Sequence, residues 1–459
     1  CSVVLCCSQM LVLRDVQQCL RREGKAAVAG GVLIHLTLGN LYSFGNMVTY
    51  MASYLRARVD TDVTYSSVVW VLAVTTMAQG LFMPLGGIIE RRLGPRVACI
   101  LGSIIMSAGV GLTFLSVRGS VVLVILTYGL MVGIGISLAY VSPMACAMKW
   151  YPERKGLING LIVGGFGLGA LGSTIFQTHY LNPDNVSVGP SGYFEDDAVL
   201  SRVPGVFLAM AGIFLCLQIL GCFLLSAPRS YQVTTTAADE RDELLDERWD
   251  QLHDLHELDG MTPPSCHYTP HDMLRTGLFY QLWSLYMLNT IVIGYINATY
   301  KSFGQTFLKD DYLLSLVGSL AALFNAGGRI FWGRMMDYTS FKTSMCCLTF
   351  TLCTLFITLT LTPYAGYPAI AYTVVVWFIF FTFCGTFVLM PTVAEKAFGS
   401  RHYTTNYGLF FTSQVLSGIL IATLNQLLLD AIGYTGCFLT IAGISAVGFT
   451  MSCLLPRRL

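Results

Sequence analysis

Apolar residues recur along this chain in long runs that are separated by polar turns. A helix needs about 20 apolar residues to cross a bilayer core about 30 Å thick. Twelve segments meet this requirement, and we expect a membrane-spanning helix in each. They cover residues 26–54, 66–89, 97–116, 120–149, 155–178, 203–226, 277–303, 312–335, 342–361, 368–392, 404–429 and 434–455.

The sixth and seventh spans are separated by a long polar stretch, whereas most other connections are short. This spacing predicts an all-α membrane protein of two pseudo-symmetric six-helix bundles. We divide the chain into a tail (1–25), a first bundle (26–227), a linker (228–275), a second bundle (276–456) and a short tail (457–459). The acidic linker fits either a disordered tether or a short amphipathic helix lying on the membrane.

Composition excludes several classes of protein. The chain is 54% hydrophobic and 12% charged, with a mean hydropathy of +0.63. Soluble proteins carry about 25% charged residues. A cytosolic enzyme, a nucleic-acid binder and a secreted disulfide scaffold are therefore excluded, and the expected partner is the lipid bilayer. The net charge of +1 implies no polyanionic partner and no nucleic acid.

Lys and Arg are distributed unevenly between the two sides of the predicted topology. With both termini on one side, 21 of the 27 basic residues fall on that side and six on the other. Cytoplasmic loops carry such an excess. We therefore expect a multi-pass membrane protein with both termini and the linker in the cytosol. A plasma membrane and an organelle membrane satisfy this bias equally.

The turns at the predicted cytoplasmic ends repeat between the two halves. Residues 86–96 read GGIIERRLGPR and residues 327–337 read GGRIFWGRMMD. A second pair, 150–160 and 398–408, shares an Asn near its end, which is followed directly by Gly160 in the first half and after one residue by Gly408 in the second. Such echoes are typical of transporter halves related by an axis along the membrane normal.

Opposite charges in these turns predict contacts that hold one conformation closed and break in the other. Ordinary positive-inside charge explains the basic residues equally well, but it explains the acidic ones poorly. The expected gating residues are Gly86, Glu90, Arg91, Arg96, Gly333, Asp337, Glu153, Arg154, Glu395 and Arg401.

The repeated Gly-x3-Glu/Asp turn, which continues as Arg-x2-Gly-Pro-Arg in the first half, resembles the signature of the major facilitator superfamily. The run Lys155–Gly160, the glycines of 164–169, the stretch 325–333 and Asn406-Tyr407-Gly408 are similar to the oxalate/formate antiporter and monocarboxylate transporter branch. The resemblance covers all twelve spans. It implies alternating access, in which two bundles rock about a central substrate site, with no cofactor.

Arg329 is the most informative charge inside a span. It lies eight residues before Asp337, which places it about 12 Å from the cytoplasmic end at 1.5 Å per residue, near the bilayer midplane. An arginine there costs about 2.5 to 3.5 kcal/mol and is usually functional. Its guanidinium can hold a carboxylate through two hydrogen bonds. The resemblance implies that Arg329 binds an anionic substrate; pairing with Asp337 or Glu90 is the alternative.

The chain departs from the resembled branch at three positions. Asn325 stands where monocarboxylate transporters have an Asp, and Asn46 aligns with their lysine in span 1. The span over 404–429 lacks the lysine of the oxalate/formate antiporters. A single fixed cation suits a monoanion or a zwitterion better than a dianion.

Further polar groups in span 1 are candidates for substrate contact. Tyr42 and Asn46 offer a hydroxyl and an amide to a carboxylate. His35 is either hydrogen-bonded packing or a proton-binding group. The expected substrate-binding residues are therefore Arg329, Asn325, Asn46, Tyr42 and His35.

These observations favour a secondary active or facilitative carrier of small monocarboxylates such as pyruvate, lactate or formate. A coupled proton and an exchanged anion both remain open as the second transported species. An amino-acid transporter of the same superfamily is one alternative, and a non-transporting nutrient receptor on a carrier scaffold is another. An intramembrane enzyme is disfavoured, because the spans contain almost no carboxylates and no metal-ligand spacing.

Overall fold

The computed structural model describes residues 22–184, 186, 189, 193–226, 268–308 and 311–456. Most of the predicted tails and the linker segment 227–267, including its possible amphipathic helix, lie outside the described residues. The described part of the chain consists of helices joined by short turns and contains no strand.

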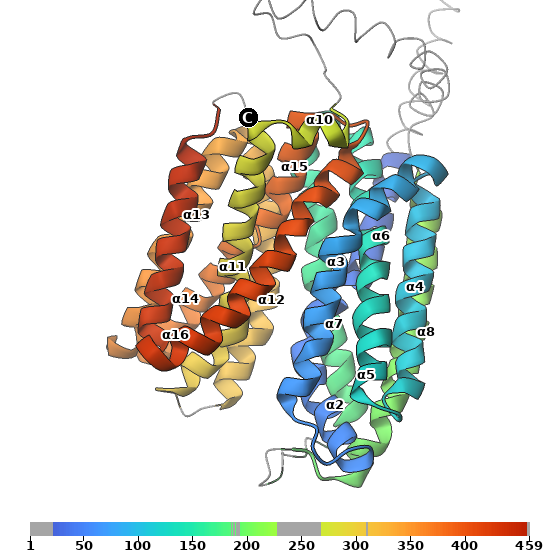
Figure 1. Ribbon diagram of the computed structural model, residues 1–459, viewed down its shortest axis with the longest axis vertical. Helices are drawn as coiled ribbons and strands as arrows, with labels where there is room; N and C mark the ends of the chain where they lie inside the picture. The colour runs from blue at the N-terminus through green and yellow to red at the C-terminus, as the bar shows by residue number, and fades with distance from the viewer. Residues whose placement is uncertain are drawn as a thin grey trace, which may run out of the picture.

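The first bundle contains six helical units of membrane-spanning length (Figure 1). They are Arg22–Arg58 with the turn η1 (Gly39–Ser43) and α2 (Phe44–Arg58), α3 (Tyr65–Leu93), α4 (Pro95–Ser116), α5 (Val121–Val124) continued by the π-helical segment η2 (Ile125–Met131) and α6 (Val132–Trp150), η3 (Pro152–Arg154) continued by α7 (Lys155–Leu181), and α8 (Asp197–Leu224).

The second bundle repeats this arrangement. It contains the short α10 (Pro270–Leu274), α11 (Gly277–Gln305), α12 (Asp311–Tyr338), α13 (Phe341–Leu361) with η4 (Thr362–Tyr364), α14 (Pro368–Phe383) followed by α15 (Thr386–Phe398), and α16 (Tyr403–Cys453). Gly433 interrupts α16 with a φ of +64°, so this long element comprises two spans.

The predicted all-helical fold of two six-helix bundles is confirmed. Nine of the described helical units are long and apolar enough to cross a membrane, and α11, α12 and the part of α16 before Gly433 occupy the other three predicted positions. The observed sixth span begins at Asp197, earlier than predicted, because the Asp196 side chain accepts the backbone N–H groups of Ala198 and Val199.

Polar side chains and glycines set the helix ends. Thr276 and Ser340 cap α11 and α13 by accepting a backbone N–H three residues later. Gly94 and Gly399 end α3 and α15 with φ values of +86° and +84°, a conformation that strongly favours glycine. The turns that contain the charged motifs are therefore tightly defined.

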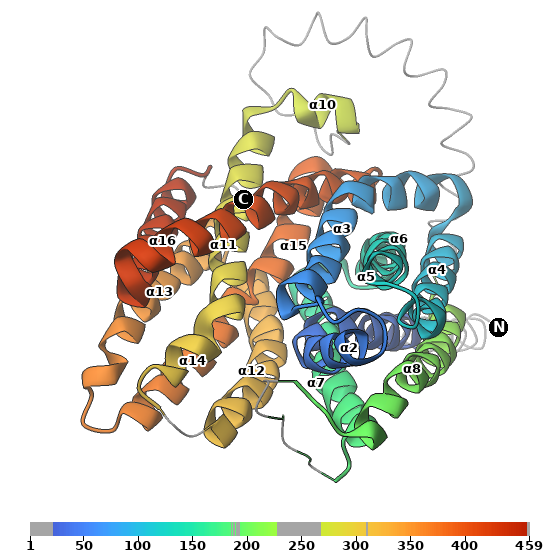
Figure 2. The ribbon, with the colours of Figure 1, turned by 60° about the horizontal axis from the view of Figure 1, so that its bottom comes forward.

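The two bundles meet through two helix pairs, α7 against α12 and α3 against α16. Figures 1 and 2 show the first bundle, coloured blue to green, beside the second, coloured yellow to red. We call the end formed by the turns 91–96, 149–155, 334–342 and 395–402 the charged end. It lies at the top of Figure 1, where α3, α15 and the start of α16 converge.

Candidate functional site

Arg329 lies at the junction of the two bundles, inside α12. Its side chain is 1% exposed, and its Nη1 donates a hydrogen bond of 2.7 Å to the carbonyl oxygen of Val163 in α7. The guanidinium carbon lies 5.5 Å from the ring centroids of both Phe166 in α7 and Phe387 in α15. The buried cation therefore contacts both halves at once.

No carboxylate in the described ranges forms an ion pair with Arg329. Asp337 instead accepts the backbone N–H groups of Gly156 and Leu157, each at 2.8 Å, and Glu90 accepts the Ser142 hydroxyl at 3.2 Å. Pairing with either of these residues, the alternative raised by the sequence, is not observed. The Nε of Arg329 is buried without a hydrogen-bond partner. The site therefore holds a positive charge with unused donor capacity.

Aromatic side chains from both bundles surround this cation. The Tyr42 ring lies 5.1 Å from Phe166, and the Tyr42 hydroxyl interacts with the Arg329 guanidinium. Tyr42 is 42% exposed, although it lies deep within the first span. The shell is completed by Tyr140, which contacts Phe166 and Phe411, and by Tyr286, which contacts Phe387 and Phe411. We call Arg329, these aromatic residues and His35 the central site.

His35 is fully buried beside this shell. Its ring centroid lies 5.1 Å from that of Tyr140, and its Nδ1 lies 2.9 Å from the carbonyl oxygen of Gly31. A carbonyl oxygen can only accept, so Nδ1 carries the hydrogen and donates it. The other ring nitrogen, Nε2, is buried without a partner.

The two asparagines predicted to contact substrate are in different environments. Asn325 lies one helical turn before Arg329, and its Oδ1 is buried without a hydrogen-bond partner, near Gly167. Asn46 instead donates hydrogen bonds of 3.2 Å to Gln177 and Thr178 of α7, within the first bundle. The structure thus brings Arg329, Asn325, Tyr42 and His35 together and engages Asn46 in a hydrogen-bond network on α7.

Three polar contacts join α7 to the second bundle at the charged end. Lys155 Nζ lies 2.6 Å from Glu395 Oε1, and Glu395 is buried. Asn159 donates a hydrogen bond of 2.9 Å to Thr392, and Asp337 caps the first turn of α7 as described above. Glu395 and Asp337, both predicted as gating residues, therefore form contacts between the halves.

The other expected gating residues take different positions. Arg91 donates to His402 Nδ1 at 2.7 Å, and Glu90 also interacts with Thr404, so both reach across to α16 and the turn before it. Gly86 packs on Ser137, and Arg96 donates to the Leu225 carbonyl, so these two act within the first bundle. Arg401 is exposed in the turn before α16.

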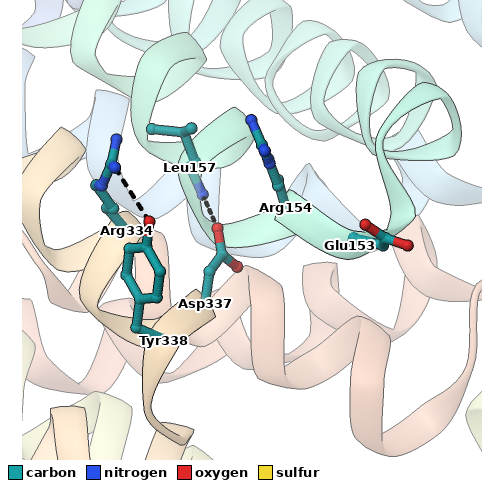
Figure 3. A pocket seen from close by; sticks show the side chains of 6 residues that line it. All are labelled: Glu153, Arg154, Leu157, Arg334, Asp337 and Tyr338. Carbon is teal, nitrogen blue, oxygen red and sulfur yellow. Dashed lines mark hydrogen bonds between the residues drawn. The ribbon is translucent and has the colours of Figure 1, made fainter.

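Glu153 and Arg154 line a pocket of about 200 Å³ between α7 and α12 at the charged end. Figure 3 shows them with Leu157 on one wall, facing Arg334, Asp337 and Tyr338 of α12. Arg334 donates a hydrogen bond of 3.0 Å to the Tyr338 hydroxyl. Among the charged residues that line it, Asp337 joins the two helices through the backbone of Gly156 and Leu157.

Glycines allow the helix backbones to touch at the charged end. A Cβ added at Gly333 would collide with the Gly156 carbonyl, and one at Gly87 would collide with the backbone of Thr405. Farther along α7, a Cβ at Gly164 would lie 3.6 Å from Ala326, and one at Gly167 would lie 3.2 Å from the Asn325 side chain. The bundles are therefore closed at the charged end.

Two six-helix bundles that close at one end over a buried cation define a membrane carrier. The family model of the Major Facilitator Superfamily matches residues 33–422 and 282–458. The chain belongs to this superfamily and is a transporter, not an enzyme.

Individual relatives agree with this family. The chain is 28% identical to "Apicoplast pyruvate carrier 1" of Toxoplasma gondii, over 95% of this chain and 88% of the relative. It is 23% identical to the "Oxalate:formate antiporter" of Oxalobacter formigenes, over 87% and 84% of the two chains. Among solved structures, the proton:xylose symporter XylE matches with a TM-score of 0.68 and 12% identity over 95% of this chain and 96% of its own, which shows the shared fold.

Several residues of the site escaped sequence reasoning. Phe166 and Phe387 gave no signal beyond apolar character, and Val163 contributes only its backbone. Lys155, Asn159 and His402 lie in the repeated turns, so their location was recognised, but the side chains that they contact were not.

Proposed function

We propose that this chain carries small monocarboxylates across a membrane by alternating access and that Arg329 binds the carboxylate. The observation that supports this most is the buried guanidinium with no carboxylate partner in the described part of the chain and with an unpartnered Nε. A bound carboxylate would accept two hydrogen bonds from the Arg329 guanidinium and offset the positive charge of that group. The aromatic shell suits a small, partly apolar anion.

The relatives support the same class of substrate. One is named as a pyruvate carrier and another as an oxalate and formate exchanger, so both printed names specify small organic anions. The single cation of the central site favours a monoanion. We further propose that the charged end, with the termini, the linker 228–275 and most Lys and Arg residues, faces the cytosol. The form described here is then closed to the cytosol.

Uptake of labelled pyruvate, lactate and formate into proteoliposomes tests the assignment. Removing one partner of a buried charge pair costs about 2 to 5 kcal/mol, so Arg329→Gln should lower uptake by about 30-fold or more. Arg334→Gln is the matched control, because Arg334 lies on the same helix but is exposed. Wild-type uptake by Arg329→Gln would rule out the proposed role.

The same proteoliposomes distinguish two other functions from carboxylate transport. If amino acids are taken up and simple carboxylates do not compete with them, the protein is an amino-acid transporter in which Arg329 binds the α-carboxylate. Saturable carboxylate binding without any flux would favour a receptor on a carrier scaffold.

A further inference from the structure

We infer that Cys346 and Cys453 form a redox-active dithiol, whose oxidation to a disulfide fastens the end of α16 to α13. The pair lies outside the central site, one helical turn beyond the charged end. The inference does not depend on which substrate is transported. It adds a covalent modification of the second bundle that responds to low-molecular-weight disulfides such as oxidised glutathione.

The sulfur atoms of the two cysteines are already in contact. Cys346 lies in the second turn of α13, Cys453 is the last residue of α16, and these helices pack against each other (Figure 2). The two Sγ atoms are 3.7 Å apart, so a shift of about 1.7 Å brings them to the length of a disulfide bond. The Phe350 and Phe449 rings, 5.7 Å apart, extend the same helix contact.

Polar contacts on either side hold the pair in this position. The Lys342 ammonium, one turn before Cys346, donates a hydrogen bond of 2.7 Å to the carbonyl oxygen of Leu455, just after α16. Gln281 of α11 donates one of 3.3 Å to the carbonyl oxygen of Met451. The last turn of α16 is therefore fixed against both neighbouring helices, which keeps the two thiols within reach of each other.

The depth of the pair makes it accessible from water. Lysines near the ends of spans place their ammonium groups at the membrane surface, and Lys342 precedes Cys346 by four residues, or about 6 Å along the helix. Cys453 is exposed, and Cys346 is partly buried. In the proposed orientation this end faces the cytosol, where thiols are kept reduced and disulfides are usually transient and redox-sensing. The dithiol is therefore the resting form, and the disulfide forms under oxidising conditions.

The reaction consists of two thiol–disulfide exchanges. The thiolate of the more exposed Cys453 attacks one sulfur of the small disulfide, which gives a mixed disulfide and releases one small thiolate. The Cys346 thiolate then attacks the Cys453 sulfur, and the second small thiolate leaves. The two protein thiols lose two electrons and two protons in total, and the small disulfide gains both and becomes two thiols.

Both cysteines belong to the second bundle, and this determines what the bond can do. The halves of such transporters move largely as rigid bodies relative to each other, so a link within one half does not oppose the rocking motion. The bond instead restricts the unfolded chain, because it closes a loop between residues that are 107 positions apart in the sequence. We therefore expect oxidation to stabilise the second bundle against unfolding.

Counting free thiols in the full-length protein tests for the bond. The purified protein is reduced, equilibrated with oxidised glutathione, unfolded, alkylated and weighed intact. The wild type should lose two more alkylation sites, without added glutathione mass, than either Cys346→Ser or Cys453→Ser. Cys347→Ser, which removes the exposed neighbour of Cys346, is the matched control and should behave like the wild type. Equal losses in the wild type and in Cys453→Ser would overturn the inference, as would a Cys347→Ser variant that loses two sites fewer.

Thermal unfolding gives an independent readout. Oxidation should raise the unfolding midpoint of the wild type and of Cys347→Ser by several degrees, and it should not raise those of Cys346→Ser and Cys453→Ser as far. Similar midpoints of all four proteins under reducing conditions would show that each variant is folded. No rise in the oxidised wild type, or the same rise in the Cys346→Ser and Cys453→Ser variants, would contradict the inference.

Discussion

Asn325 places a neutral amide one helical turn before the buried Arg329. Residues four apart on a helix are neighbours, so a carboxylate here would reach the guanidinium. The amide oxygen of Asn325 is buried without a partner, and it leaves the positive charge of Arg329 uncompensated. The identity of this one residue therefore controls how much of the cation remains for a substrate.

Replacing Asn325 by Asp should weaken substrate binding. The new carboxylate would pair with Arg329 and compete with the substrate anion, and a coupling of about 1.4 kcal/mol raises a dissociation constant about tenfold. The half-saturation concentration for pyruvate uptake measures this. Asn325→Ala, which removes the amide without adding charge, should raise this half-saturation concentration much less. Equal effects of the two variants would show that charge is not the cause.

Helices α7 and α12 touch because glycines face each other at the charged end. Gly156 and Gly333 approach so closely that a methyl group on either would collide with the carbonyl of the other. Small residues at such contacts are the usual means of close helix approach in membranes. The two glycines therefore allow the backbones of α7 and α12 to touch at the charged end.

Gly333→Ala should destabilise the closed charged end. The added Cβ would meet the Gly156 carbonyl, whereas Gly327→Ala on the same helix would meet no atom within 4 Å and serves as the control. Spin labels at Arg92 and Arg401, in a background without reactive cysteines, report the separation of α3 from the start of α16. The distance distribution should shift to longer values in Gly333→Ala and stay unchanged in Gly327→Ala. Identical distributions for both would show that this contact does not control closure.

Few polar contacts hold the two bundles together. One of them is the ion pair between Lys155 and Glu395, which is largely buried. Residues 155 and 395 belong to different halves, so the contact forms only when the halves close. Breaking it leaves a buried charge without compensation, which costs far more than breaking an exposed pair. The whole-molecule conformational equilibrium therefore depends on this pair.

Reversing either charge alone should slow uptake by about tenfold or more, because like charges then face each other in the closed state. The double reversal Lys155→Glu with Glu395→Lys should recover most of the rate. The exposed pair Arg58 and Asp197 provides the control, and its reversal should change uptake less than about twofold. A double variant as slow as the single ones would indicate that other contacts dominate closure.

The sequence by itself determined the number, order and approximate limits of the spans, the division into two similar halves, and the burial of Arg329. These features follow from local patterns, because a bilayer requires a run of apolar residues and penalises a charge within it. Only the tertiary structure decided the partners of the polar side chains. Arg329 donates a hydrogen bond to the Val163 carbonyl, and Asn46 donates one to Gln177. Asp337 caps α7, and Lys155 pairs with Glu395. Each contact joins different helices, and helix packing, unlike helix formation, depends on which surfaces of distant segments fit together.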